Sequence, residues 1–138
     1  MKRTLVVAAM TIAWSGTAFA ADAMGPVVEH VARTHLTVTG QPIVVPPNPD
    51  IVVSVTTFAP GARVPEHKHL YPHLVYVMDG VLTVTNTETG QVFEAKKGEF
   101  VAEMQNTWHY GVNNGSVPVK LLVIDEVPQG TPANMVAK

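Results

Sequence analysis

The chain is organised as short runs in which apolar and polar residues alternate with a period of two. This alternation is typical of β-strands that bury one face, and Val, Thr, Ile and aromatic residues fill many of the positions. Gly, Pro, Asn and Asp separate the runs, and none of them has the period of a long helix. We predict strands at residues 51–59, 73–78, 81–86, 91–95, 99–104, 108–112 and 119–127. Short strands at this spacing predict an all-β fold, a sandwich or a barrel.

Turn-forming residues lie at the ends of the predicted strands. Asp79-Gly80 separates two alternating apolar runs and predicts a β-hairpin. Further turns are expected at Gly90, Gly98 and Gly115. The Pro-Pro-Asn-Pro segment at 46–49 cannot join the middle of a sheet, because proline has no N–H to donate. It separates an N-terminal arm at 21–45, which could add one or two strands, from a barrel domain at 46–128.

The two ends of the chain differ from the domain between them. A short positive start, an apolar segment at 5–14 and Ala18-Phe19-Ala20 follow one another in the order of a secretory signal peptide at 1–20. We predict cleavage between Ala20 and Ala21, and hence a secreted or periplasmic protein. The apolar segment is too short to anchor the chain in a bilayer, so no membrane partner is expected. The tail at 129–138 is expected to be loosely ordered.

Composition excludes several classes of function. The chain has no cysteine, which rules out disulfides, thiolate metal ligands and cysteine nucleophiles. Its formal charge of −2 becomes −4 when Lys2 and Arg3 are removed with the signal peptide, and it has no basic stripe, so no nucleic-acid partner is expected. Ser54 and Ser116 are the serines that remain, and neither lies in the Gly-x-Ser-x-Gly motif of serine hydrolases.

Three of the six histidines are crowded into residues 67–73. His67 and His69 project from the same face of a strand, because residues two apart share a face. His73 follows Pro72, which suits a strand end or bend, and opens the next apolar run. The three imidazoles can then converge on one point and bind a divalent transition metal. The alternative is an exposed His-rich loop, or histidines satisfied singly by hydrogen bonds.

This stretch and a second one downstream resemble the two sequence motifs of the cupin family. In the first, the family's spacing is matched by Gly61, His67, His69 and Gly80, but His73 stands where the family usually has glutamate. In the second, it is matched by Gly98, His109 and Asn113, while Met104 and Asn106 replace the usual Pro and Gly. The resemblance covers roughly residues 46–128. It implies a double-stranded β-helix, the jelly-roll barrel of cupins.

The resemblance also implies a metal site. It assigns His67, His69 and His109 as ligands, with His73 as the fourth. Cupins use Fe, Mn, Cu, Ni or Zn, so the divalent ion stays open. Four neutral imidazoles would leave the full charge of the ion uncancelled and lower the pKa of a bound water further than a set with a carboxylate. Octahedral coordination would leave two positions open for dioxygen and a substrate, whereas tetrahedral coordination would close the site.

Other titratable residues near the motifs are weaker candidates. Glu66 and Glu103 could orient a ligand or act as a base. We interpret both as solvated surface carboxylates, which is the commoner situation. His30 and His35 lie outside both motifs and are expected to be exposed in the N-terminal arm.

Two hypotheses about function follow. The first is a metal-dependent, dioxygenase-type oxidoreductase that binds a small organic substrate at the barrel mouth. The alternative is a non-catalytic module that holds a small ligand or a structural or stored metal, which the lack of an obvious acid or base in the motifs favours. Small cupins commonly pair through their N-terminal strands, so the resemblance also implies a homodimer, with the apolar segment 41–47 as a candidate for exchange.

Overall fold

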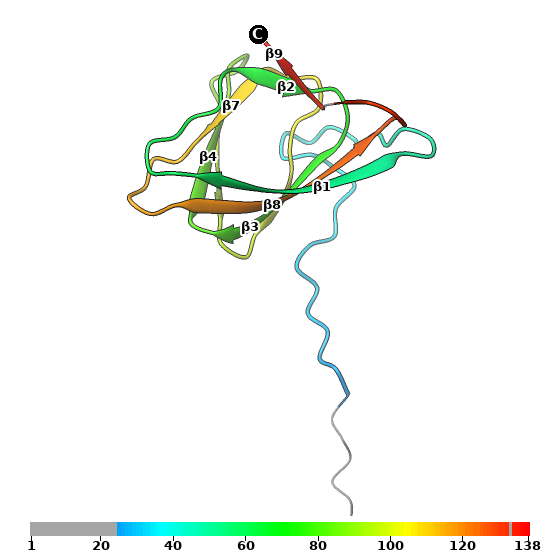
Figure 1. Ribbon diagram of the computed structural model, residues 1–138, viewed down its shortest axis with the longest axis horizontal. Coiled ribbons are helices and arrows are strands. Elements are labelled where there is room, and N and C mark those ends of the chain that lie inside the picture. The colour runs from blue at the N-terminus through cyan, green and yellow to red at the C-terminus, as the bar shows by residue number, and fades with distance from the viewer. Residues whose placement is uncertain (1–24, 133) are drawn as a thin grey trace, which may run out of the picture.

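The computed structural model describes residues 25–132 and 134–138. Within these ranges the chain forms strands and no helix (Figure 1). The strands are β1 (Asp50–Phe58), β2 (His67–His69), β3 (His73–Asp79), β4 (Val81–Asn86), β5 (Val92–Lys96), β6 (Phe100–Ala102), β7 (His109–Val112), β8 (Val119–Val127) and β9 (Met135–Ala137). The signal peptide predicted at 1–20 lies outside the described residues. In the part that is described, no helix is long and apolar enough to cross a membrane.

The strands form two antiparallel sheets. One sheet has the order β1-β8-β3-β6 and the other has the order β5-β4-β7-β2-β9. All seven strands predicted from alternation are present, with ends that differ by a residue or two. The expected all-β, jelly-roll architecture is therefore confirmed. The alternating pattern gives each sheet an apolar face, and these two faces pack together.

The core lies between the two sheets. One sheet contributes Val75 and Val77 of β3 and Leu121 of β8 to this core. The other sheet contributes Leu82 and Val84 of β4. Each buried aliphatic side chain of this size contributes about 1.5–3 kcal/mol by leaving water. This core holds the strands that carry the histidines in a fixed arrangement.

The turn at Asp79-Gly80 is not a hairpin, contrary to the sequence-based prediction. β3 pairs with β6 and β8, whereas β4 pairs with β5 and β7, so the chain crosses here from one sheet to the other. Gly80 has φ +79°, and a Cβ at this position would lie 2.8 Å from the carbonyl oxygen of Pro118. The Asp-Gly pair thus encodes a tight corner, and alternation alone does not reveal which sheet each strand joins.

The two ends of the described chain also differ from expectation. The described part of the arm, residues 25–45, contributes no strand. It forms an isolated bridge between Leu36 and Pro42, and it is joined to the barrel by hydrogen bonds from the N–H of Val38 to the carbonyl of Ala102 and between Val44 and the side chain of Gln105. Its first described residues run away from the barrel (blue to cyan in Figure 1). The tail is more ordered than expected, because β9 pairs with β2 along its whole length. Pairing with β2 places the tail beside the histidines.

Candidate metal centre

Four of the six histidines come together at one end of the barrel. His67 and His69 project inward from β2, and His109 of β7 is the direct cross-strand partner of His67. The ring centroids of His67 and His109 are 4.5 Å apart. His73, the first residue of β3, stacks on His69 with centroids 3.8 Å apart and the rings nearly parallel. All but His73 are buried, with His109 only 1% exposed.

Each of these imidazoles is oriented by an acceptor at Nδ1. His67 donates to the carbonyl oxygen of Pro65 at 2.8 Å, His109 to that of Thr107 at 2.7 Å, and His69 to that of Asn134 at 3.3 Å. His73 donates to Oδ1 of Asp125 at 2.7 Å. Because a carbonyl oxygen can only accept, the proton of the neutral ring lies on Nδ1 and the lone pair on Nε2. This is the tautomer and orientation in which proteins present histidine to metals.

The surroundings of the ring nitrogens agree with a bound metal ion in two respects: one of them is buried without a partner, and the possible ligand atoms lie close together. His69 Nε2 is buried and has no hydrogen-bond partner among the described residues. An unpaired buried nitrogen is costly unless something fills its lone pair. One ligand atom each from His67, His69 and His109 lie within 4.8 Å of one another, and so do those of His69, His73 and Glu103. The donor set has the composition of a divalent transition-metal site.

Glu103 belongs to this cluster and is not a surface residue, so the sequence-based interpretation of it was wrong. It is 7% exposed, and its Oε2 lies 3.1 Å from Nε2 of His109 and 3.5 Å from Nε2 of His69. Glu103 has the same parity as Val101, which pairs with the buried Val75. That parity was the available signal, since it points the carboxylate into the barrel.

Charge and burial act on the titration of this cluster in opposite directions. Burial works to raise the pKa of Glu103, but its close contacts with the rings of His109 and His69, and the charge interaction with His73 and His69, hold that pKa well below its ordinary value. Burial lowers the pKa of His67 to about 4 and also lowers that of His69. For His109 burial acts in the same sense, yet the hydrogen bond to Glu103 and its charge raise the pKa overall. His67 and His69 are therefore neutral at neutral pH.

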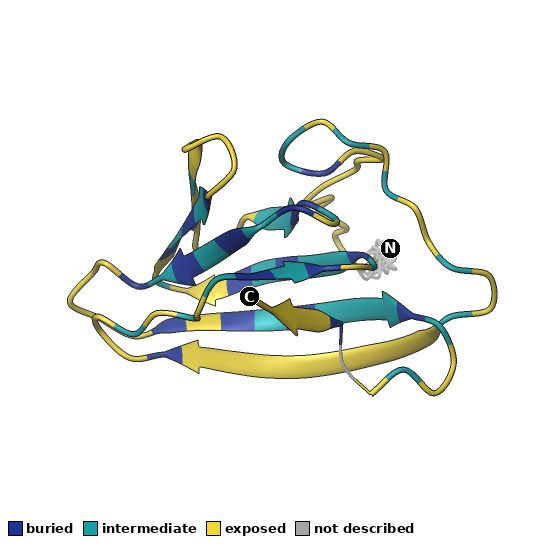
Figure 2. Cartoon of the chain, turned by 90° about the horizontal axis from the view of Figure 1, so that it is seen from above, coloured by how far each residue is buried: buried dark blue, intermediate teal, exposed yellow. Residues whose placement is uncertain are grey.

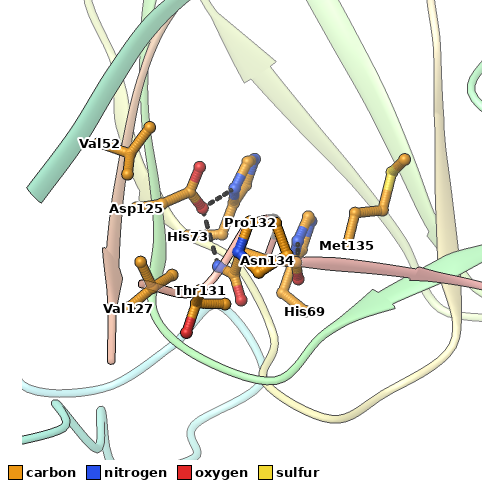
Figure 3. Close-up of a pocket in the computed structure, with 9 residues that line it drawn as sticks. All are labelled: Val52, His69, His73, Asp125, Val127, Thr131, Pro132, Asn134 and Met135. Carbon is orange, nitrogen blue, oxygen red and sulfur yellow. Dashed lines mark hydrogen bonds and ion pairs between the residues drawn. The ribbon is translucent and has the colours of Figure 1, made fainter. Parts of the chain in front are cut away.

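Asp125 and Asn134 form a support for His73 that the sequence did not reveal (Figure 3). The side-chain amide of Asn134 donates to Oδ1 of Asp125 at 2.7 Å, the same oxygen that accepts from His73. Burial disfavours charge on His73, but Asp125 and the charge of Glu103 outweigh it and raise its pKa. Asp125 has the parity of the buried Leu121 and Val123, so an acid on an apolar strand face was the overlooked signal.

The histidines open onto a small apolar cavity. It has a volume of about 150 Å³, and Phe58, Val64, Leu82 and Leu121 contribute to its wall. A second hollow of about 280 Å³ also borders His69 and His73, and Thr131, Pro132 and Asn134 of the tail line it (Figure 3). Met135 of β9 borders both. The tail thus forms part of the wall between the cavity and its surroundings.

The remaining predicted residues have other surroundings. Glu66 accepts hydrogen bonds from Thr87 and from Nζ of Lys138 at the surface, in agreement with the expectation. His30 and His35 are exposed, also as expected. Asn106 has φ +55°, a left-handed conformation that asparagine tolerates, so the turn before His109 forms without the usual glycine.

Comparison with known proteins agrees with this architecture. The sequence pattern of the family described as "Cupin domain" matches residues 54–125, which is more than half of the chain. The chain therefore belongs to the cupin family. The matched region runs from β1 to Asp125 and includes all four clustered histidines.

The chain is also similar to individual proteins. It is 28% identical over 78 residues to gentisate 1,2-dioxygenase of Haloferax sp, an alignment that covers 56% of this chain and 22% of that protein. The polyketide cyclase RemF from Streptomyces resistomycificus superimposes with a TM-score of 0.52 and 21% identity, covering 59% of this chain and 57% of RemF. The formate complex of Lactobacillus farciminis oxalate decarboxylase superimposes with a TM-score of 0.53 and 20% identity, covering 63% and 26%. These two structures support the fold alone.

Proposed function

We propose that this cupin is a metal-dependent oxygenase that acts on a small organic molecule. The observation that carries the proposal is the set of Nδ1-anchored imidazoles, which present their Nε2 lone pairs to an apolar cavity. His67, His69 and His109 are the proposed metal ligands, with His73 as the fourth. The ion is one of Fe, Mn, Cu, Ni or Zn, and when bound it supplies a Lewis acid and a place for dioxygen and substrate.

The protein's own residues set the size and polarity of the substrate. A cavity of roughly 150 Å³ accommodates a molecule of about the size of benzene. Among the residues that the structure describes, no lysine or arginine lines this cavity, and Glu103 adds negative charge. The substrate that fits is therefore a small compound of about one ring, held by apolar contact with Phe58, Leu82 and Leu121 while these side chains exclude water.

The similarity to a dioxygenase supports the reaction class. The aligned region covers only 22% of the gentisate 1,2-dioxygenase, so it supports the presence of a related barrel rather than the same substrate. We further propose that the protein works outside the cytoplasm, as the signal peptide predicted at 1–20 indicates. It would then acquire its metal there.

We propose that two copies pair through the outer face of the β1-β8-β3-β6 sheet. Thr56 and Phe58 of β1 line the cavity and point inward, so Ile51, Val53 and Val55 face out, and Val53 is 58% exposed. The strand β1 is exposed along nearly its whole length (Figure 2). On β8 the outward positions are Lys120, Leu122, Ile124 and Glu126. This order is self-complementary, because a two-fold axis between Leu122 and Ile124 pairs each lysine with the partner's glutamate.

Oxygen uptake tests the proposed reaction. Protein loaded in turn with Fe²⁺, Mn²⁺, Cu²⁺, Ni²⁺ and Zn²⁺ is incubated with single-ring phenols, small diketones and sugars, and the His67→Ala protein serves as the control. We expect oxygen consumption with a single-ring compound and a redox-active ion, and none in the control. If every ion raises the melting temperature but no compound is consumed, the non-catalytic alternative replaces the oxygenase.

A further inference from the structure

We propose that Glu103 is a direct carboxylate ligand of the ion that the histidines bind. This inference rests on the proposed function, since it assumes that the cluster holds a metal. It changes the ligand set from imidazoles alone to imidazoles with one carboxylate. The charge and the ion preference of the centre change with it.

The backbone fixes Glu103 at the cluster. Its N–H donates to the carbonyl oxygen of His73 at 3.0 Å, directly after β6 has paired with β3. The neighbouring Ala102 and Met104 are buried, and Met104 is fully so. The carboxylate is thus held inside the barrel by the backbone hydrogen bond to His73 and by the buried residues before and after it.

The contacts of Oε2 call for a cation. His109 donates from Nδ1 to the carbonyl oxygen of Thr107, so the neutral ring has a lone pair on Nε2. This Nε2 lies 3.1 Å from Oε2 of Glu103, which is also an acceptor. Two acceptors at this distance repel each other unless a positive charge lies between them. A proton on His109 would satisfy this pair alone and leave His69 Nε2 unpaired. A single metal ion satisfies His69, His109 and Glu103 together.

The spacing of the atoms agrees with shared coordination. Ligand atoms about 2.0–2.2 Å from a metal are about 3.0 Å apart at right angles and about 3.4 Å apart at tetrahedral angles. Oε2 lies 3.1 Å from His109 Nε2 and 3.5 Å from His69 Nε2. Asp125 differs, because it accepts from Nδ1 of His73 on the far side of that ring and so orients a ligand without being one.

A carboxylate ligand has a measurable consequence for ion preference. It cancels one unit of the ion's charge, and oxygen donors favour Mn²⁺ over Zn²⁺ relative to an all-nitrogen set. We therefore compare Mn²⁺ and Zn²⁺ affinities of wild-type, Glu103→Gln and Glu94→Gln proteins by competition with a chelator. Glu94 is the matched control, because its carboxylate lies on a strand but is more than half exposed.

We expect Glu103→Gln to lose more Mn²⁺ affinity than the roughly 10- to 100-fold that is typical of a residue that only orients a ligand. The loss for Mn²⁺ should also exceed the loss for Zn²⁺, and the affinities of Glu94→Gln should equal those of the wild type. Retention of Mn²⁺ affinity within about threefold, or equal losses for the two ions, overturns the inference. If Glu103→Gln does not fold, a crystal structure of the wild-type Mn²⁺ complex decides: an ion within about 2.3 Å of Oε2 supports it, and an ion bound by histidines alone overturns it. Failure of the wild type to bind either ion overturns the proposed function as well.

Discussion

At the scale of single residues, the centre depends on which nitrogen of each ring carries the proton. Carbonyl oxygens of Pro65, Thr107 and Asn134 accept hydrogen bonds from the Nδ1–H groups of three histidines, and Asp125 accepts one from the fourth. Burial lowers the pKa of His67 to about 4, so this ring is neutral near neutral pH. The lone pairs on Nε2 are therefore available near neutral pH without a prior deprotonation of His67 or His69.

Removing a clustered histidine should remove the metal. We expect His67→Ala or His109→Ala to abolish stoichiometric binding of the added ion, because each substitution removes one of the three ligand nitrogens that lie close together. His30→Ala, at an exposed position in the arm, should bind as the wild type does. Elemental analysis after gel filtration measures this, and a full metal complement in His67→Ala would refute the ligand assignment.

The stability of the metal-free protein should depend on pH through His67. Its pKa of about 4 in the folded protein lies below the ordinary value of about 6.5. Between these values the unfolded state binds the proton and the folded state does not, so the free energy of unfolding falls as the pH falls from 6.5 to 4, by roughly 3 kcal/mol. Urea unfolding across this range should show a steeper decrease for wild type than for His67→Gln, and parallel curves would contradict the assignment.

The convergence of the histidines could be predicted from the sequence, but the burial of the carboxylates beside them was not. His67 and His69 share a face because they are two residues apart on a strand, and this local rule holds whatever the rest of the fold does. The burial of Glu103 depends on the pairing of Val101 with Val75, and that of Asp125 on the pairing of β8 with β3. Parity shows which side chains share a face but not which face is buried, so the composition-based expectation placed Glu103 at the surface and Asp125 was not considered.

At the scale of elements, the tail strand completes the site. β9 pairs with β2, and just before it Asn134 bonds the backbone of Tyr71 and Pro72 as well as Asp125. These contacts hold together the loop between His69 and His73. The sequence predicted a loose tail because β9 spans three residues and has no alternating run of its own; its order comes from the edge of β2.

Asn134→Ala should weaken both fold and site. The change leaves several buried polar groups near Tyr71 and Asp125 without a partner, at about 1–3 kcal/mol each, so we expect unfolding free energy to fall by about 3 kcal/mol. Metal affinity should fall about tenfold, as for other residues that orient ligands. Asn114→Ala, at an exposed turn, is the control. Unchanged urea unfolding and metal competition in Asn134→Ala would show that the tail has no structural role here.

At the scale of the whole molecule, the two faces of one sheet have different surroundings. The inner face of β1-β8-β3-β6 contributes Val75, Val77 and Leu121 to the core. The outer face carries the exposed apolar residues of β1 next to the self-complementary positions of β8. The alternating pattern predicted the inner face of the sheet. β1, however, is apolar on both faces, and no local rule of sequence tells which surface a second copy would cover.

A charge placed on the outer face should prevent pairing. We expect the wild-type protein to have twice the monomer mass in light scattering, and Val53→Lys to be monomeric because its charge would be buried against an apolar surface. Val92→Lys provides the control, since Val92 is 56% exposed on β5 in the other sheet. A wild-type monomer, or a Val53→Lys dimer, would exclude this interface.

The most direct test of the account is titration of the uniformly ¹⁵N-labelled, metal-free protein with Zn²⁺, followed by NMR of the imidazole nitrogens. The account predicts that one equivalent shifts the Nε2 resonances of His67, His69 and His109 together, while their Nδ1 protons remain and His30 and His35 do not respond. Saturation at another stoichiometry, or a shift confined to His30 or His35, would contradict a shared metal centre.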